Sequence, residues 1–109
     1  MTSGIEVIAK ERQRQIQQKG FNKIHDSQYK TSALNNAAIC YAIFAGSSNS
    51  MREAIRQQVK FGHTPGGWPW DLQSWKPSDD NCDSSRIREL AKAGALIAAE
   101  IDRLKRKAS

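Results

Sequence analysis

The sequence lacks several features that would place it in a common class at once. Its 109 residues contain no apolar run near the roughly 18 to 20 residues that a membrane-spanning helix needs. The first residues show no charged region followed by an apolar one, so they do not resemble a signal peptide. The two cysteines, Cys40 and Cys82, are too few for a disulfide framework, and neither has the ligand spacing of structural zinc. These absences predict a cytoplasmic protein.

Motifs for catalysis are equally scarce. Metal-assisted nucleotide hydrolysis needs several carboxylates that converge on one ion, and helical pyrophosphohydrolases supply them as Glu-x-x-Glu and Glu-x-x-Asp pairs. In this chain the residue three positions after every glutamate is Ala, Arg or Lys. Gly66-Gly67 is not followed by the Gly-Lys-Ser/Thr of a phosphate loop, and no Gly-x-Ser-x-Gly elbow occurs. We therefore expect no catalytic residues, no metal ligands and no cofactor.

What the chain does have is positive charge, with a formal net charge of +6 and a pI near 9.6. This charge favours anionic partners such as a nucleotide, nucleic acid or an acidic protein surface. Part of the excess lies near the C-terminus, where it also complements the negative end of a helix dipole: Arg103, Lys105, Arg106 and Lys107. The acidic residues of the same region have the spacing of surface ion pairs: Glu89–Lys92, Glu100–Arg103 and Asp102–Arg106.

The pattern of apolar residues, caps and breakers predicts an all-α fold, a single domain over residues 1–109 built as a small bundle of about four helices. Ser3 and Glu6 have the spacing of a capping box, and so do Ser50 and Glu53. The expected helices span residues 4–19, 31 or 32 to 45, 50–61 and 85–106. No stretch alternates polar and apolar residues in the way of a half-buried strand.

Two of these helices are expected to form the core. Residues 37–45 are apolar on every side, which is typical of a central helix contacted from several directions. In the last helix, apolar residues recur at three- and four-residue spacing: Ile87, Leu90, Ala91, Gly94, Ile97, Ala98, Ile101 and Leu104. Gly94 on this face predicts close packing against the alanine-rich second helix. The first helix, polar nearly all round, is expected at the periphery.

All three tryptophans and two of the three prolines lie within residues 68–77, the segment WPWDLQSWKP. Proline excludes a helix interior and exposed indole rings are costly in water, so we expect this segment to lie over the core as an irregular lid. The rings would either plug gaps in the core or also wall a pocket for a flat, charged ligand. Both interpretations account for the rings, whereas the second also accounts for the charges nearby.

His25-Asp26 is the second candidate for chemistry. A histidine beside a carboxylate can act as a base, bind phosphate when protonated or ligate a metal, whereas an aspartate before a helix is often only a cap. In the tryptophan segment, the rings offer stacking faces, Lys76 a cation and Asp71 an acceptor for base or sugar groups. The predicted ligand-binding residues are His25, Asp26, Trp68, Trp70, Asp71, Trp75, Lys76, Arg86, Arg88 and Lys92.

Five blocks of sequence carry a family resemblance: residues 11–15 (ERQRQ), 25–26 (HD), 37–42 (AAICYA), 68–77 with its WPW and WKP motifs, and 93–101 (AGALIAAEI). Together they resemble a family of small bacteriophage and prophage accessory proteins over nearly the whole chain. The resemblance implies a phage setting inside a bacterial host, in which small proteins counter host defence by binding host factors or sequestering nucleotide immune signals. Residues 48–67 form a longer segment than in the usual form of that family.

Three functions are consistent with these observations. The first is a binding module, not an enzyme, that holds a nucleotide-derived ligand, for example to sequester a host immune signal. The second is a divergent all-α nucleoside triphosphate pyrophosphohydrolase, and the third is an inhibitor that binds a host defence protein or nucleic acid through its basic surface. The expected partners are thus a nucleotide or other phosphate-bearing molecule or a host protein, and no membrane. The second and last helices would serve a homo-oligomer as readily as a monomer core.

Overall fold

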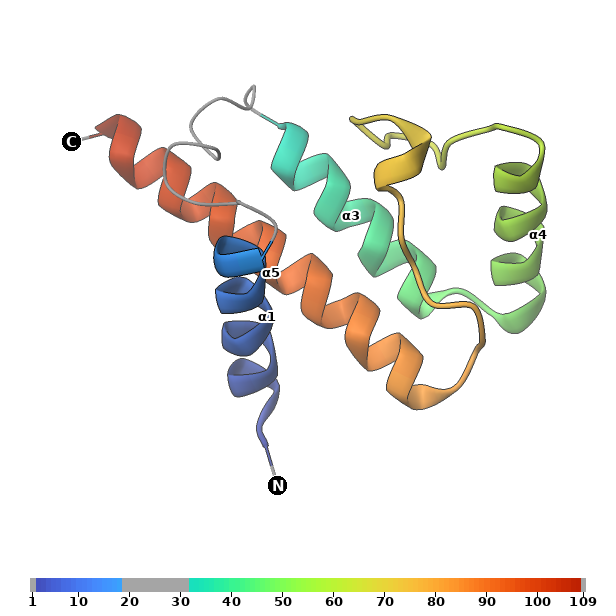
Figure 1. The fold of residues 1–109 in the computed structure, drawn as a ribbon, viewed down its shortest axis with the longest axis horizontal. Helices are drawn as coiled ribbons and strands as arrows, with labels where there is room; N and C mark the ends of the chain where they lie inside the picture. The colour runs from blue at the N-terminus through green and yellow to red at the C-terminus, as the bar shows by residue number, and fades with distance from the viewer. Residues whose placement is uncertain (1, 19–31, 109) are drawn as a thin grey trace.

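The described part of the chain is a set of helices joined by a long loop that carries the tryptophans (Figure 1). The computed structural model describes residues 2–18 and 32–108, so the predicted site residues His25 and Asp26 lie outside the described residues. The elements are α1 (Gly4–Gln18), α3 (Ala33–Gly46), α4 (Asn49–Lys60), the short 3-10 helix η1 (Leu72–Ser74) and α5 (Asp83–Ala108). Within these ranges there are helices and no strand, which confirms the predicted all-α class. None of the described helices has both the length and the apolarity needed to cross a bilayer.

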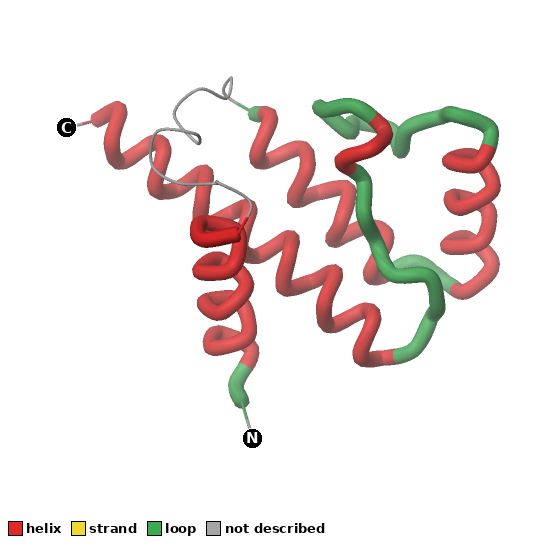
Figure 2. The backbone as a smooth tube through the Cα atoms, viewed as in Figure 1, coloured by secondary structure: helices red, strands yellow, loops and turns green. Residues whose placement is uncertain are grey.

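The long helix α5 organises the other elements. Helix α3 runs alongside it and α1 crosses it, while the loop after α4 returns past α3 to the start of α5 (Figures 1 and 2). The core forms where α3, α5 and this loop meet, and its buried members are Leu34, Ala37, Ala38, Cys40, Tyr41, Phe44, Trp68, Trp75, Ala93, Leu96 and Ala99. The loop is therefore part of the core, as the lid interpretation requires.

Helix α5 buries a different face from the one its apolar pattern predicts, so that prediction was wrong. The five large aliphatic residues of the expected face are 45% to 52% exposed: Ile87, Leu90, Ile97, Ile101 and Leu104. The buried residues are Ser85, Glu89, Ala91, Ala93, Ala95, Leu96, Ala99 and Arg103, of which Ala91 alone belongs to the expected face. Most of these are small, which lets neighbouring backbones approach closely, and the charged ones are paired.

The packing partner predicted for Gly94 was also wrong. A Cβ atom at this position would lie 2.6 Å from Cδ1 of Ile8, so the glycine makes room for α1. Because α1 crosses α5 at this point, Ile8 of the mostly polar α1 packs against Gly94. A second contact between the two helices is the ion pair between Arg12 and Asp102, with 3.4 Å between Nη2 and Oδ2.

Helix α3 is not contacted on every side, contrary to the prediction. Its buried face holds Leu34, Tyr41 and Phe44, whereas Ile39 and Ile43 on the opposite side are exposed. The difference arises because α5 and the tryptophan loop cover only part of the circumference. The apolar sequence of residues 37–45 could not show which part that would be.

The helix caps agree with the sequence at one site and differ at another. At α1 the capping box is confirmed: the backbone N–H of Ser3 donates to Glu6 Oε1 (3.1 Å), and that of Glu6 donates to Ser3 Oγ (3.3 Å). At α4 the prediction of Ser50 as the cap was wrong. Ser48 has the extended backbone of a cap and accepts a hydrogen bond from the N–H of Met51 at 3.2 Å.

A buried ion pair joins α4 to α5. Arg52 and Glu89 are 0% and 1% exposed, and two hydrogen bonds of 2.6 and 2.9 Å connect the guanidinium to both carboxylate oxygens. The predicted surface pair between Glu89 and Lys92 was therefore wrong about Glu89. The pair between Glu100 and Arg103 forms as predicted, at 2.7 Å, but it is largely buried and not on the surface.

Candidate functional site

The residues 68–77, called the Trp lid from here on, are held to α3 by a cluster of aromatic rings. Trp75 stacks on Tyr41 with 4.7 Å between ring centroids and meets the ring of Phe44 edge to face at 5.7 Å. Trp68 meets Tyr41, Trp70 and Trp75 edge to face at 5.0 to 5.6 Å. Such contacts add to the energy of burying the rings, so the cluster fixes the lid as one body.

Local hydrogen bonds shape the lid between its rings. The indole N–H of Trp68 donates to the backbone carbonyl of Asp71 at 2.9 Å. The Asp71 carboxylate caps the short helix η1, since its Oδ1 atom accepts from the backbone N–H (3.2 Å) and the hydroxyl (2.7 Å) of Ser74. After η1, the N–H of Lys76 donates to the hydroxyl of Tyr41 at 3.1 Å. Trp70 and Asp71 are thereby held at the outer edge of the lid.

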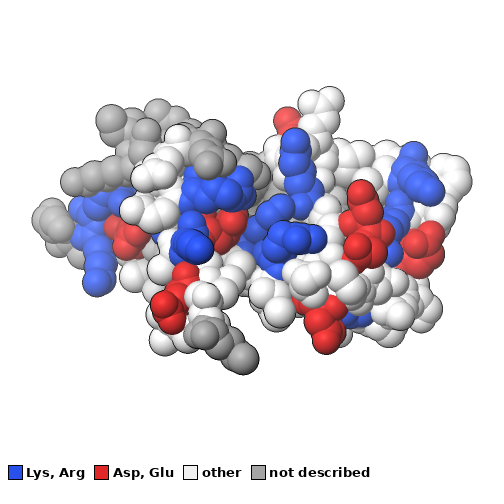
Figure 3. All heavy atoms as spheres, turned by 60° about the horizontal axis from the view of Figure 1, so that its bottom comes forward, with Lys and Arg blue, Asp and Glu red and all other residues white. Residues whose placement is uncertain are grey.

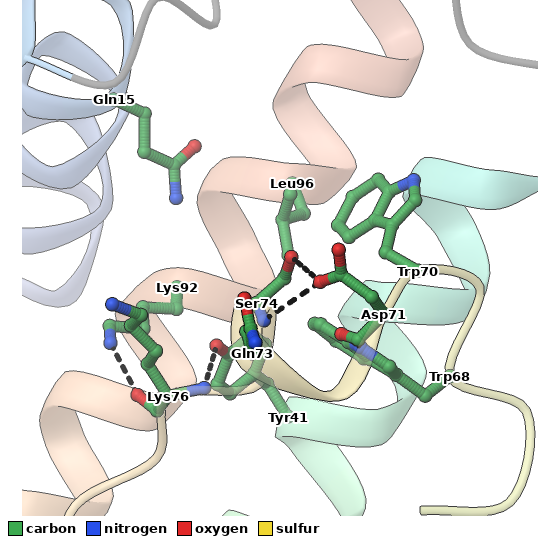
Figure 4. A pocket seen from close by; sticks show the side chains of 10 residues that line it. All are labelled: Gln15, Tyr41, Trp68, Trp70, Asp71, Gln73, Ser74, Lys76, Lys92 and Leu96. Atoms are coloured by element: carbon green, nitrogen blue, oxygen red, sulfur yellow. Dashed lines mark hydrogen bonds between the residues drawn. The ribbon is translucent and has the colours of Figure 1, made fainter. Parts of the chain in front are cut away.

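Between the lid, α1 and α5 lies an open pocket of about 740 Å³, called the Trp pocket from here on (Figure 4). Its lining residues are Gln15, Tyr41, Trp68, Trp70, Asp71, Gln73, Ser74, Lys76, Lys92 and Leu96. Its volume lies within the range of about 300 to 1,000 Å³ that is typical of small-molecule sites. The lining combines aromatic faces with a few polar and charged groups, which is the usual composition of such sites.

Two lysines give the Trp pocket its positive side. The ammonium of Lys92 donates to the backbone carbonyl of Lys76 at 2.7 Å and lies 5.5 Å from the centre of the Tyr41 ring. Burial, as the largest cause, raises the pKa of the Tyr41 hydroxyl. The pocket therefore presents two cations, a neutral phenol and one carboxylate, that of Asp71, to whatever enters it.

Gln15 brings to the pocket an acceptor that has no hydrogen-bond partner within residues 2–18 and 32–108. It is almost completely buried, and its side-chain N–H donates to Glu11 Oε2 at 3.2 Å, while its Oε1 atom has no hydrogen-bond partner among the described residues. A buried acceptor without a partner costs about 1 to 3 kcal/mol. Figure 4 shows Gln15 reaching from α1 toward the space across from Trp70 and Asp71. A ligand with an amino or hydroxyl group would remove that cost.

The structure brings together part of the predicted site. Trp68, Trp70, Asp71, Lys76 and Lys92, five of the predicted ligand-binding residues, line the Trp pocket. Trp75 is the part of the lid that is buried in the core, and it is not among the residues that line this pocket.

Two predicted arginines lie elsewhere. Arg86 binds the end of α3, where its Nη1 atom donates to the carbonyls of Ala45 and Ser47, both at 2.7 Å. It thus satisfies carbonyls that a helix end leaves free. Arg88 lines a neighbouring depression beside α1 rather than the Trp pocket.

The sequence patterns did not point to the remaining lining residues of the Trp pocket: Gln15, Tyr41, Gln73, Ser74 and Leu96. Gln15 and Leu96 lie 81 positions apart in the sequence and meet only because α1 crosses α5. Tyr41 carried a usable signal, because a polar hydroxyl within an otherwise apolar helix needs a partner.

The polar loop before α5 holds the other notable carboxylate. Asp80 accepts hydrogen bonds from the backbone N–H and the thiol of Cys82 and from the hydroxyl of Ser85. These bonds, first that of the Cys82 thiol, lower the pKa of Asp80 to about 2. Among the residues that the structure describes, no three His, Cys, Asp or Glu side chains gather in a way that could hold a metal ion.

Comparisons of the chain with protein-family models, with curated proteins and with solved structures found no match. The geometry of the Trp pocket is therefore the basis for a functional proposal.

Proposed function

We propose that the protein is a binding module, not an enzyme, that holds a nucleotide-derived ligand in the Trp pocket. The observation that carries this proposal is the meeting of the Trp68 and Trp70 rings with the ammonium groups of Lys76 and Lys92 around one opening. Aromatic faces bind bases by stacking, and lysines bind phosphate as point charges. A nucleotide offers both groups at once.

Each part of the ligand has a counterpart in the pocket. Trp70, half-buried and held edge-on by Trp68, is the ring against which a base would stack. The ammonium groups of Lys76 and Lys92 would face a phosphate. Gln15 Oε1 and the Asp71 carboxylate would accept hydrogen bonds from base amino groups or sugar hydroxyls.

The setting of this binding is part of the proposal. The resemblance of the sequence blocks to phage and prophage accessory proteins supports a role inside an infected bacterium. There, the protein would sequester a nucleotide immune signal of the host and so counter its defence. The net charge of +6 supports this role, because it raises the rate at which an anionic ligand reaches the protein.

The test is a titration of the protein with mononucleotides, dinucleotides and cyclic dinucleotides, followed by tryptophan fluorescence. We expect saturable quenching with at least one class and weaker binding for Trp70→Ala, by roughly the 1 to 3 kcal/mol of one stacked base. Lys107→Gln is the matched control for charge, because Lys107 lies in the last turn of α5 and does not line the Trp pocket.

Two other outcomes would overturn the proposal. If no nucleotide at 1 mM, roughly the weakest affinity worth calling specific, changes the fluorescence or the melting temperature, the pocket does not hold nucleotides. If pyrophosphate is released from a nucleoside triphosphate in the presence of Mg²⁺, the protein is an enzyme, and the pyrophosphohydrolase alternative replaces the binding module.

A further inference from the structure

A second depression adjoins the Trp pocket on the side of α1. This depression, called the α1 pocket from here on, has a volume of about 620 Å³. It is lined by Thr2, Val7, Lys10, Glu11, Arg14, Ile87, Arg88, Ala91 and Lys92. The lining thus combines apolar side chains with several cationic ones.

The two pockets share Lys92, which lines both of them. They are also joined through α1, because Gln15 of the Trp pocket donates a hydrogen bond to Glu11 of the α1 pocket. In the space-filling view, Lys and Arg side chains gather in the middle of one face of the molecule, beside α1 (Figure 3). A single ligand could therefore lie across both pockets with its centre at Lys92.

The charge of the α1 pocket is positive although it contains a carboxylate. Burial, the largest single cause, raises the pKa of Glu11, but the hydrogen bonds and charge of Arg14, the hydrogen bond from Gln15 and the charge of Lys92 together lower it below its usual value. The two hydrogen bonds from Arg14, of 2.6 and 2.9 Å, neutralise the pair. The lining of the α1 pocket holds four cationic residues, Lys10, Arg14, Arg88 and Lys92, against the one carboxylate of Glu11.

Each pocket alone is large enough for about one nucleotide unit, because small-molecule sites begin at about 300 Å³. The apolar lining residues Val7, Ile87 and Ala91 suit a second base, whereas Lys92, which lines both pockets, suits a phosphate that links two units. A mononucleotide would leave one of the two pockets and its cations unused.

From this continuity we infer that the ligand is a dinucleotide, with one base on the Trp lid, the linking phosphate at Lys92 and the second base in the α1 pocket. This inference rests on the proposed function and deepens it. It assigns a role to Arg88, which the sequence singled out and which lies outside the Trp pocket.

The test compares the affinities of AMP, the linear dinucleotide pApA and cyclic di-AMP for the folded full-length chain by isothermal titration calorimetry. We expect one of the two dinucleotides to bind at least 10-fold more tightly than AMP. Arg88→Gln should weaken dinucleotide binding at least 3-fold while AMP binding changes less than 2-fold. Trp70→Ala should weaken both, and Lys107→Gln neither. Arg88 is exposed, and the fold of each variant is checked by its circular dichroism and melting temperature.

The outcomes distinguish a failure of the dinucleotide inference from a failure of nucleotide binding as such. If AMP binds as tightly as both dinucleotides, or if Arg88→Gln leaves dinucleotide binding unchanged, the inference about the ligand is wrong while the nucleotide site stands. If none of the three binds, the proposed function fails as well, and with it the dinucleotide.

Discussion

Arg52 is a fully buried arginine whose N–H groups all have acceptors. Besides the two bonds to Glu89, it donates to the carbonyls of Phe44 (2.9 Å) and Asp80 (2.7 Å) and to the side chain of Asn81 (2.8 Å). It also lies 4.2 Å from the centre of the Phe44 ring. One side chain therefore joins α3, α4, α5 and the loop before α5, and its desolvation is compensated by complete hydrogen bonding.

Replacing this arginine should be costly. Arg52→Met leaves the Glu89 carboxylate buried without its counter-charge, and breaking a buried pair in this way typically costs about 3 to 5 kcal/mol. We expect the free energy of unfolding, measured by urea denaturation, to fall by that amount. The double variant Arg52→Met/Glu89→Met should be more stable than Arg52→Met alone, because no buried charge is left unpaired.

The matched control is Arg56→Met, one turn further along α4. Arg56 is more exposed than Arg52, and its ion pair with Glu53 is long, at 3.6 Å. Its Nη2 atom also donates to the carbonyl of Asp80 (2.8 Å) and to Asn81 Oδ1 (3.0 Å), so its loss has a cost of its own. Because this loss leaves no buried carboxylate without its counter-charge, it should lower the free energy of unfolding less than Arg52→Met does. If Arg52→Met and Arg56→Met lower the free energy of unfolding equally, breaking the buried pair has no special cost and the prediction is wrong.

At the scale of elements, the sequence predicted helices well and helix faces less well. The caps and breakers placed the helices to within a few residues, because these signals act locally on the backbone. Which face of α5 is buried depends on the elements that pack against it. The large aliphatic residues Ile87, Leu90 and Ile97 made the exposed face look more apolar in the sequence than the buried face, which consists largely of alanines. A buried ion pair between residues 37 positions apart has no local signal, so Glu89 appeared to be a surface residue.

Two adjacent residues of α5 test which face is buried. Leu96 is 3% exposed and Ile97 is 48% exposed, so the two substitutions differ in burial and little in position. Leu96→Ala should lower the free energy of unfolding by about 2 to 5 kcal/mol, because it leaves a cavity. Ile97→Ala should change it by less than about 1 kcal/mol, since surface substitutions have small effects. Thermal or urea denaturation of the two variants checks this.

The reverse order would show that the sequence pattern was correct. A large loss for Ile97→Ala alone would mean that the exposed row of aliphatic residues is covered in solution by something outside the described chain. Measuring Ile97→Ala at two protein concentrations would then show whether that cover is a second copy of the chain.

At the scale of the whole molecule, the candidate site is predictable only in part. The Trp lid was recognisable because its rings and charges are close together in the sequence. The walls contributed by α1 and by residue 96 of α5 depend on how the helices cross, which local patterns do not determine. The same limit applies to Arg86 and Arg88, which are two positions apart but serve a helix end and the lining of a pocket.

The environment of the three indoles also has an optical consequence. Trp68 and Trp75 are buried, whereas Trp70 is half-buried at the edge of a lysine-lined opening on a chain of net charge +6. A collisional quencher should thus reach one emitting population and leave the other untouched, so that a Stern–Volmer plot curves downward. Iodide should be the more effective ion and caesium the less, because the surrounding cations attract the first and repel the second. A straight plot with equal slopes for both ions would mean that the three rings share one environment. The fluorescence of Trp70 could then not be distinguished from that of Trp68 and Trp75.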